Sequence, residues 1–406
     1  MAHVDTGDPR FLPAGTAAAP RRRLRLSWTD PRLRNVIWQV LILGTVAFVV
    51  WFLVRNTSRN LEARHIAGGW GFLWQPASIP IGETPIAYTP AVSSYGRALL
   101  IGILNTLKVS AVGVLLATLL GTAVGIGRLS RNWLLSRITA VYVEGVRDIP
   151  LLLQLFFWYG FVQALPGPRQ AFHPVAGLFL SNRGIKLPQL DWAQAHGLAL
   201  AAFVFGLLAT LAWSRLADSR QARTGRRPLT WPIAVFLLLV LPVGVWAAFG
   251  APFHLDLPAL RGFNFQGGLT ITPEYAALLV GLVVYTATYI AEIVRSGILA
   301  IPRGQWEAGE ALGLSRGVVL RRIVLPQSMR VIIPPMASQY LNLVKNSSLA
   351  VAIGYQDIVS IADTTLNQTG QAIEGVAIIM GVYLTFSLSI STFMNWYNKR
   401  MALRER

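Results

Sequence analysis

The chain has no cysteine among its 406 residues, and only 13% of them are charged, about half the fraction in an average soluble domain. Without cysteine it can form no disulfide bond, thiolate metal site or cysteine nucleophile. No lysine follows a glycine, which excludes a phosphate-cradling P-loop, and no two histidines have the spacing of a helical zinc site. The sequence therefore predicts no catalytic, metal-binding or cofactor-binding residue, and any ATP has to be hydrolysed by another chain.

Long apolar runs dominate what is present. Hydrophobic residues make up 53% of the chain, and the mean hydropathy is +0.49. Runs of roughly 20 apolar residues cross a bilayer as helices, and six such runs are uninterrupted. They are Val36 to Val54, Val109 to Ile126, Gly197 to Trp213, Pro232 to Gly250, Ala276 to Ile293 and Val376 to Met394. Two further runs, 138–165 and 331–361, are interrupted by ionisable residues. Counting both predicts an all-α integral membrane protein of about eight transmembrane helices.

Positive charge is distributed unevenly between the predicted loops. The net charge is +18, from 36 Lys and Arg against 18 Asp and Glu. Eight crossings place both termini on one side, which collects 25 of the basic residues, against 8 on the other side and 3 inside spans. The positive-inside rule then predicts that both termini are cytoplasmic. Because these residues orient loops and meet lipid headgroups, the charge needs no nucleic-acid partner.

Three local features refine this topology. The Arg-rich stretch 214–230 predicts a solvated cytoplasmic loop. Gly125 and Gly127 match only part of a dinucleotide-binding motif, and no strand precedes them. Gly121 and Gly125 instead predict close helix packing, which is typical of small residues inside a membrane. Lys108 lies inside a span, where its side chain is expected to snorkel or to form a pair within the bundle.

The segment 301–327, IPRGQWEAGEALGLSRGVVLRRIVLPQ, predicts two short helices in a cytoplasmic loop. The first covers 305–312, and Gly313 supplies the turn after it. Ser315 is placed to cap the second helix, and Pro326 is expected to stop it. Helix physics leaves open whether the first helix docks into a partner protein or rests on lipid headgroups.

The same loop carries a family resemblance. Glu307, Ala308, Gly313, Ile323, Leu325 and Pro326 match the pattern EAA, three residues, G, nine residues, I-x-LP of permease subunits of bacterial ABC importers. Gly309 departs from the pattern, which has alanine there. Further similar stretches lie at 105–110, 142–159, 289–298 and 343–349. Together they resemble the polar amino acid permease family, which includes the histidine and glutamine importers. The long layout is similar to permeases of the general L-amino acid and glutamate/glutamine/aspartate/asparagine type.

The resemblance implies a type I ABC importer permease core of five helices with three additional helices. The implied segments are a cytosolic basic tail (1–35), an extra span (36–54), a periplasmic segment (55–96), a first core part (97–165), an inserted segment with two spans (166–269), a second core part (270–396) with the EAA loop (300–327), and a cytosolic tail (397–406). The implied function is ATP-driven import of polar L-amino acids across a bacterial inner membrane. The implied partners are a second homologous permease in a heterodimer, two ABC ATPases that bind ATP and Mg, and a periplasmic binding protein.

Two groups of candidate site residues follow. The ATPase-coupling residues implied by the resemblance are Glu307, Ala308, Gly309, Gly313, Leu314 and Arg316. The substrate-pathway candidates, chosen because polar and ionisable residues inside spans are costly, are Tyr285, Tyr289, Glu292, Asn342, Lys345, Asn346 and Ser347.

The pathway group on the span 276–293 has a plain structural alternative. Tyr285, Tyr289 and Glu292 share one helix face, which can line a pathway or serve as a packing face where Glu292 pairs with Arg295. The polar stretch from Lys345 predicts a broken helix beside a cavity.

Glu144, Arg147 and Asp148 begin an interrupted span, and local ion pairs are the default expectation for them.

Two other classes of function are less compatible with the sequence. A secondary amino acid transporter needs a coupling-ion site and often an internal repeat, and neither is convincing here. A membrane enzyme needs a catalytic constellation, whereas the histidines are dispersed and no paired acidic residues face each other in the spans. The expected result for an importer is uptake that depends on internal ATP and survives the collapse of ion gradients.

Overall fold

The computed structural model describes residues 31–63, 68–225 and 228–401, which form two units separated at residues 64–67. The first unit is represented by helix α1 (Pro31–Ala63), which contains the first predicted span. Its 33 residues extend about 50 Å, longer than the ~30 Å hydrocarbon core of a bilayer. The side chains of its apolar run are exposed, as expected of a helix surrounded by lipid. The part of the predicted tail before residue 31 lies outside the described residues.

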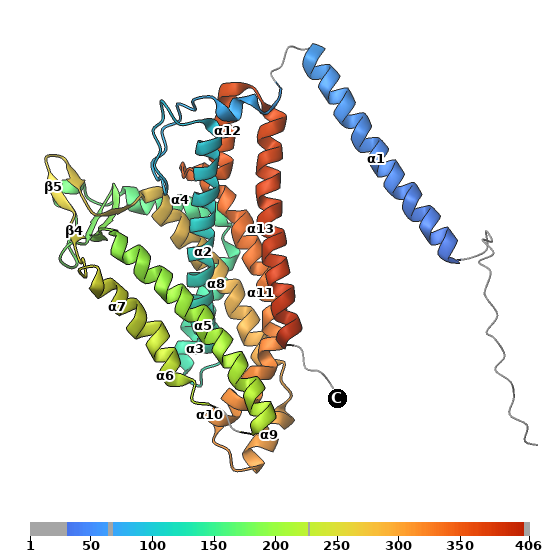
Figure 1. Ribbon diagram of the computed structural model, residues 1–406, viewed down its shortest axis with the longest axis vertical. Helices are drawn as coiled ribbons and strands as arrows, with labels where there is room; N and C mark the ends of the chain where they lie inside the picture. The colour runs from blue at the N-terminus through green and yellow to red at the C-terminus, as the bar shows by residue number, and fades with distance from the viewer. Residues whose placement is uncertain (1–30, 64–67, 226–227, 402–406) are drawn as a thin grey trace, which may run out of the picture. The chain divides into compact units, whose positions relative to one another are not determined.

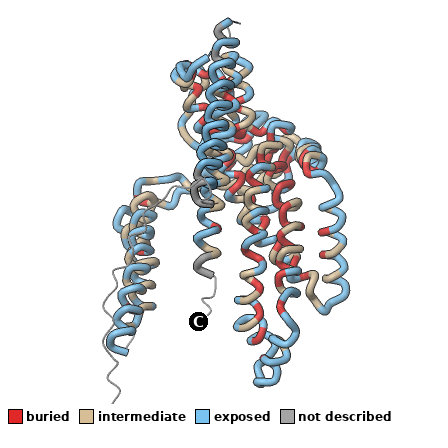
Figure 2. Tube along the Cα trace, turned by 90° about the vertical axis from the view of Figure 1, so that its right-hand side faces the viewer, coloured by how far each residue is buried: buried red, intermediate tan, exposed pale blue. Residues whose placement is uncertain are grey.

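A bundle of helices forms the core of the second unit (Figure 1). Its members are α2 (Tyr95–Arg128), α3 (Trp133–Asp148), α4 (Leu151–Gln163), α8 (Pro273–Leu299), α11 (Leu325–Asn346), α12 (Ile358–Thr369) and α13 (Ala372–Met401). Buried residues concentrate on the inner helices of this bundle (Figure 2). The loop with α9 (Arg303–Ala311) lies at one end of the unit, which we call the α9 end. The opposite end carries α12 and the strands, and we call it the strand end.

The close contact between α2 and α8 depends on two glycines. A Cβ atom added at Gly121 would lie 2.8 Å from the carbonyl oxygen of Ala287, and one at Gly125 would lie 2.6 Å from that of Ala291. Both distances are shorter than any normal van der Waals contact. Only a residue without a side chain therefore allows the two backbones to approach so closely, which confirms the packing role predicted for this pair.

Six helices of the described chain are long and apolar enough to cross a membrane. They lie at Ile37–Thr57, Tyr95–Arg128, Gln194–Thr224, Trp231–Ala248, Pro273–Leu299 and Ala372–Asn398. Each matches one of the six uninterrupted runs to within two residues at the ends where the run extends beyond the helix, so these predictions are confirmed. The total of eight is not confirmed, because neither interrupted run forms one long apolar helix.

The first interrupted run is two helices, α3 and α4, separated at Ile149 and Pro150. The proline ring disfavours helical geometry in the residue before it, so α3 ends there. The amide nitrogen of Gln154 donates to the carbonyl oxygens of Val146 (2.8 Å) and Ile149 (2.9 Å). This side chain thereby satisfies carbonyls that the end of α3 leaves without helical partners.

The structure corrects the role predicted for Pro326, which lies just before the second interrupted run. The chain runs from α10 (Arg316–Val319) through a π-helical turn, η4 (Leu320–Val324), directly into α11. Pro326 lies in the first turn of α11 and does not end the helix. The wider π-helical turn before it relieves the clash that a proline ring makes with a preceding carbonyl. A 3₁₀ turn, η5 (Ser347–Ile353), follows α11.

The inserted segment forms a helical hairpin. Its first limb is α5 (Gln194–Thr224), and its second is α6 (Trp231–Val235), a π-helical turn η3 (Phe236–Val240) and α7 (Leu241–Ala248). The prediction of a loop over 214–230 is wrong for its first part, because α5 continues to Thr224. Arg, Ala and Gln in this stretch are good helix formers, and Gly225 ends the helix with a φ of 70°.

Short strands lie outside the helices and were not expected from the sequence. They are β1 (Phe179–Ser181), β2 (Gly184–Leu187), β3 (Gln189–Leu190), β4 (Leu255–Asp256), β5 (Ala259–Arg261), β6 (Asn264–Gln266) and β7 (Leu269–Ile271). Antiparallel pairing gives a sheet of order β1-β2-β7 and two further pairs, β3-β4 and β5-β6. β2 precedes the helical hairpin in the sequence, and β7 follows it. Their pairing therefore links the two chain segments that connect the hairpin to the bundle.

Candidate functional site

The loop at the α9 end contains the two short helices predicted for it. α9 ends before Gly313, whose φ of 72° turns the chain into α10. Ser315 occupies the N-cap position of α10, but its side chain makes no capping hydrogen bond, which corrects that detail. Of the coupling candidates on α9, Glu307 and Ala308 are exposed, whereas Gly309 is buried.

A small apolar cluster packs against α9. Ile301, Val319 and Val324 are its buried members, and Ile298, Trp306 and Ile323 pack against them. A Cβ atom at Gly309 would lie 2.7 Å from Cγ2 of Val319, so α9 rests directly on the start of the next helical segment. The guanidinium of Arg316 lies 5.8 Å from the centre of the Trp306 ring, which adds a weak cation–π contact.

An open cleft of about 1010 Å³ separates this loop from the adjacent ends of α2 and α8. Its charged and polar lining consists of Ser130, Arg131, Arg303, Glu307, Glu310 and Arg316. Leu312 and Leu314 follow α9 and are exposed, so apolar as well as charged groups are accessible on the loop.

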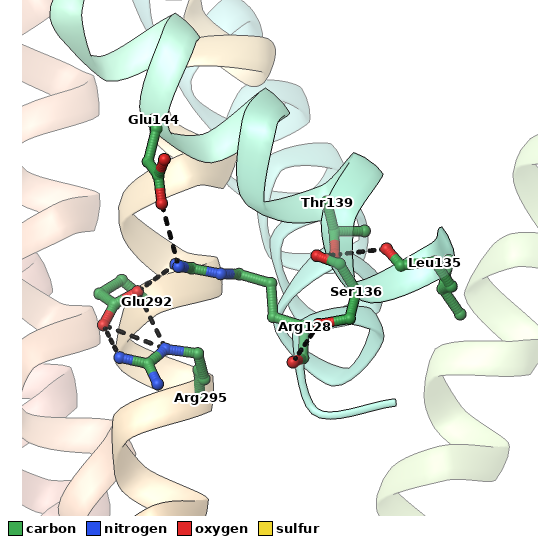
Figure 3. A network of polar contacts seen from close by, with 7 residues as sticks. All are labelled: Arg128, Leu135, Ser136, Thr139, Glu144, Glu292 and Arg295. Atoms are coloured by element: carbon green, nitrogen blue, oxygen red, sulfur yellow. Dashed lines mark hydrogen bonds and ion pairs between the residues drawn. The ribbon is translucent and has the colours of Figure 1, made fainter. Parts of the chain in front are cut away.

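An ion-pair network joins α2, α3 and α8 above the loop (Figure 3). The carboxylate of Glu292 accepts a hydrogen bond of 2.6 Å from Arg295 and a second, short one from Arg128. Arg128 also lies 3.7 Å from the carboxylate of Glu144. The alternative in which Glu292 pairs with Arg295 is therefore observed, and Arg128 is a partner that sequence reasoning did not find.

We expect Glu292→Gln to destabilise the bundle by about 1–3 kcal/mol, because two guanidinium groups then lose their shared counter-ion and one of its two acceptor oxygens in a partly buried place. The side chains of Arg128 and Glu292 are only 14% and 31% exposed. The measurement is the melting temperature of the detergent-purified chain. Glu144→Gln is the matched control, since the Glu144 side chain is 70% exposed, and it should change little. Equal melting temperatures for all three proteins would contradict this account.

The tyrosines predicted on the same face of α8 also meet polar partners. The hydroxyls of Tyr285 and Tyr289 are 2.9 Å apart, and the guanidinium of Arg147 lies 4.6 Å from the centre of the Tyr289 ring. Local ion pairs were the default expectation for Arg147, but among the described residues its observed partner is this aromatic ring. The structure thus brings Tyr285, Tyr289 and Glu292 into one polar face between α8 and α3.

The second group of pathway candidates lies elsewhere, at the end of α11. Asn342 and Lys345 are exposed, and Ser347 is buried with its hydroxyl donating to the carbonyl of Val344 (2.7 Å). The helix was predicted to break at Lys345. Instead, α11 continues to Asn346, and the chain changes to 3₁₀ geometry at Ser347. Within the described residues no hydrogen bond or ion pair joins Asn342, Lys345, Asn346 or Ser347 to the tyrosine face of α8.

Glu83, at the strand end, is a residue that the sequence analysis missed. One of its carboxylate oxygens lies 2.7 Å from the amine of Lys108, and the other accepts a hydrogen bond of 2.6 Å from the Thr272 hydroxyl. The amine of Lys108 also lies 4.3 Å from the centre of the Tyr275 ring. The pairing alternative for Lys108 is therefore observed. A signal existed, because Glu83 is one of only two acidic residues in 55–97 and a lysine inside a span needs a counter-ion.

The segment around Glu83 is held firmly against the helix ends. The side-chain amide of Asn105 donates to the carbonyl oxygens of Glu83 and Gln356, both at 3.0 Å. The hydroxyl of Tyr88 donates to the carbonyl of Ile79 at 2.9 Å, and burial raises the pKa of Tyr88 above its ordinary value. This part of the predicted periplasmic segment 55–96 thus packs across the ends of α2 and α12.

The helix bundle, with six helices of the described chain long and apolar enough to cross a bilayer, is that of a multi-pass helical membrane protein. The chain belongs to the family of binding-protein-dependent transport system inner membrane components, whose model matches residues 113–403. This membership rejects the alternative of a secondary transporter.

Similar proteins match almost the whole chain. The chain is 48% identical to YhdX of Escherichia coli (strain K12), named as an amino-acid ABC transporter permease protein, over 94% of this chain and 97% of that protein. It is 45% identical to the general L-amino acid transport system permease protein AapQ of Rhizobium johnstonii, over 94% and 96%. It is 40% identical to the glutamate/glutamine/aspartate/asparagine transport system permease protein BztB of Rhodobacter capsulatus, over 95% and 98%.

Proposed function

We propose that this chain is a permease subunit of an ATP-driven importer of polar L-amino acids. The support is that relatives named as amino acid permeases match at least 94% of its length at 40–48% identity. The observation that carries the mechanism is the loop at the α9 end, with Glu307 exposed and Gly309 packed against Val319. A helix supported in this way can transmit a push from a partner into the bundle.

The proposed complex contains a second, homologous permease in a heterodimer, two ABC ATPases and a periplasmic amino acid binding protein. ATP and Mg bind to the ATPases, and this chain holds no cofactor or metal. The ATPase-coupling surface consists of Glu307, Ala308, Gly309, Gly313, Leu314 and Arg316. The exposure of Glu307, Ala308 and Leu314 supports this role, whereas Gly309 acts as support beneath the surface.

The proposed orientation puts the α9 end and both termini in the cytoplasm of a bacterial cell, with the strand end in the periplasm. The excess of basic residues in the predicted segments on the α9 side supports it. Glu83, Lys108 and Thr272 then close the bundle on its periplasmic side. The proposed segments keep the limits given above, from the tail 1–35 to the tail 397–406.

The proposed substrate pathway includes Tyr285, Tyr289 and Glu292, together with Asn342, Lys345, Asn346 and Ser347. The polar face of α8 supports the first three, because hydroxyl and charged groups lie together there inside an apolar helix. Motion of α9 reaches this face through α8, which ends at Leu299, four residues before α9 begins. Closure of the ATPases would rotate the α9 ends of the helices and open the strand end.

Charge reversal at Glu307 tests the proposed coupling. We expect Glu307→Lys to reduce ATP-driven uptake about fivefold, because loss of one interface contact of about 1 kcal/mol weakens ATPase binding by that factor. The measurement is amino acid uptake by the assembled complex in proteoliposomes that contain ATP, together with the amount of ATPase that co-purifies. The matched control is Asp363→Lys, which changes an exposed acidic residue of α12 at the strand end.

Two outcomes would count against the proposal. Uptake that needs an ion gradient but no ATP would contradict the importer itself. ATP-driven uptake that is the same in Glu307→Lys, in the Asp363→Lys control and in the unchanged protein would leave the importer standing and remove the role of this loop.

A further inference from the structure

A pocket outside the bundle lies at the base of the inserted hairpin. Its volume is about 420 Å³, and it is formed mainly by the last three turns of α5. This part of α5 lies at the α9 end of the unit (Figure 1). The residues that matter for its chemistry are Trp213, Leu216, Ser219, Arg220 and Arg223.

The pocket is strongly basic. Arg220 and Arg223 are three residues apart on α5, so their side chains project from the same face of the helix. Both are exposed, and no ion pair joins either guanidinium to an acidic side chain of the described residues. Two uncompensated guanidinium groups beside one pocket suit a phosphate group. The Ser219 hydroxyl on the same lining already donates to the carbonyl oxygen of Leu216.

A second, independent observation comes from Trp213. Its indole nitrogen Nε1 is buried and has no hydrogen-bond acceptor within the described chain. The hydroxyl of Thr210, one turn earlier on α5, is in the same situation. Buried donors nearly always have partners, so the unpaired indole N–H of a residue that lines the pocket is a sign that an acceptor is missing.

Apolar surface continues from the pocket along the hairpin. Leu208, Leu211 and Leu216 on α5 are all at least half exposed, and so is Trp231 at the start of α6. α5 packs chiefly on α6, η3 and α7, which leaves its outer side without a protein partner in the described chain. A ligand that covers both regions has an anionic head for the arginines and an apolar tail for the leucines.

We propose that this pocket binds the headgroup of an anionic phospholipid. The phosphate contacts Arg220 and Arg223, and the acyl chains lie along the exposed leucines of α5. The basic character fits the membrane side on which arginines face anionic headgroups. A bound lipid holds the base of the hairpin at a fixed depth. The inference needs only that α5 crosses a membrane, and it does not depend on the transported substrate.

The experiment measures lipid retention by native mass spectrometry of the full chain purified in detergent. Phosphatidylglycerol is added in one arm and phosphatidylcholine in another. We expect Arg220→Gln/Arg223→Gln to reduce binding of phosphatidylglycerol about tenfold and to leave binding of phosphatidylcholine unchanged. The matched control is Arg215→Gln, which removes an exposed arginine of α5 that does not line the pocket.

A third arm distinguishes a lipid from a free anion. Inorganic phosphate is added to the phosphatidylglycerol complex, and we expect it to displace little lipid, because it lacks the apolar chains. Efficient displacement would overturn the lipid assignment in favour of a free phosphate site. Equal retention by the double variant and the Arg215→Gln control would overturn the site altogether.

A further variant covers the case in which the double variant does not fold. Trp213→Phe removes the indole N–H and keeps an aromatic ring of similar packing. Its retention of phosphatidylglycerol should fall severalfold while its melting temperature in lipid-free detergent stays the same. Unchanged retention in this folded variant would contradict the hydrogen bond assigned to Trp213.

Discussion

Gly125→Ala is expected to leave little folded protein in the membrane, although it adds only one methyl group. The new Cβ atom would lie 2.6 Å from the carbonyl oxygen of Ala291 and 3.0 Å from Cβ of Val294. The first of these is backbone, so no rotamer change can relieve the contact. The helices α2 and α8 must separate instead, and this loosens a closely packed contact of the bundle. Overpacking of this kind costs about 3 kcal/mol or more, a large part of the stability of a typical protein.

The measurement is the yield of membrane-inserted, detergent-stable protein, with its melting temperature. Gly145→Ala is the matched control, because it makes the same change within α3, where no atom lies within 4 Å of the new Cβ atom. The control should be as stable as the original protein or slightly more stable, since alanine favours helix over glycine by about 1 kcal/mol. Similar yields for the two variants would show that the α2–α8 approach is not as tight as described.

Gly309→Val is expected to abolish most ATP-driven uptake while leaving the bundle folded. Even a single Cβ atom at this position would lie 2.7 Å from Cγ2 and 3.0 Å from Cγ1 of Val319. Val319 is β-branched and fully buried, so its side chain cannot turn away easily. α9 therefore has to tilt or lift from its support. A cost of about 1–3 kcal/mol corresponds to a loss of coupling of about tenfold or more.

A compensating substitution makes this prediction specific. Gly309→Ala restores the residue of the family pattern, yet here it should impair uptake, because Val319 occupies the space. Adding Val319→Ala should recover most of the loss, as expected for two residues in direct contact. Gly304→Ala, on the same helix with no atom within 4 Å of its new Cβ, is the control for helix propensity. If Gly309→Ala transports as well as the original chain, α9 does not depend on this contact.

The parts of the fold that the sequence predicted are those governed by local composition. Six apolar runs became six long helices, and Gly121 and Gly125 allow the close approach expected of small residues. The loop helices were found because Gly313 has to turn the chain and because the flanking residues match a family pattern. In each case the decisive information lies within a few residues of the position concerned.

The failures have a common physical cause, which is that the deciding partner is distant in sequence. Lys108 was recognised as costly inside a span, but its counter-ion Glu83 lies 25 residues earlier in a segment of irregular structure. Glu292 was paired with its helical neighbour, whereas Arg128 reaches it from another helix. Pro326 is a local exception: it was expected to end a helix, and the π-helical turn directly before it accommodates it instead.

The short strands failed for a related reason. β2 and β7 are separated by the whole helical hairpin, and no periodicity within a few residues predicts that they pair. The substrate-pathway residues remain predictions. The structure separates them into the polar face of α8 and the end of α11, and it shows internal partners for Glu292 and for both tyrosines.

The two-sided binding of Glu83 has a consequence for the way this end of the molecule opens. Its carboxylate touches Lys108 on α2 with one oxygen and Thr272 with the other, and the Thr272 hydroxyl is itself the acceptor that caps α8 through the N–H of Tyr275. If the chain at Glu83 moves away from both helices, Lys108 therefore loses its counter-ion, and the hydrogen bond to Thr272 at the cap of α8 breaks in the same movement. Losses that must occur together give an all-or-none transition with a threshold, so weak fluctuations leave this side sealed.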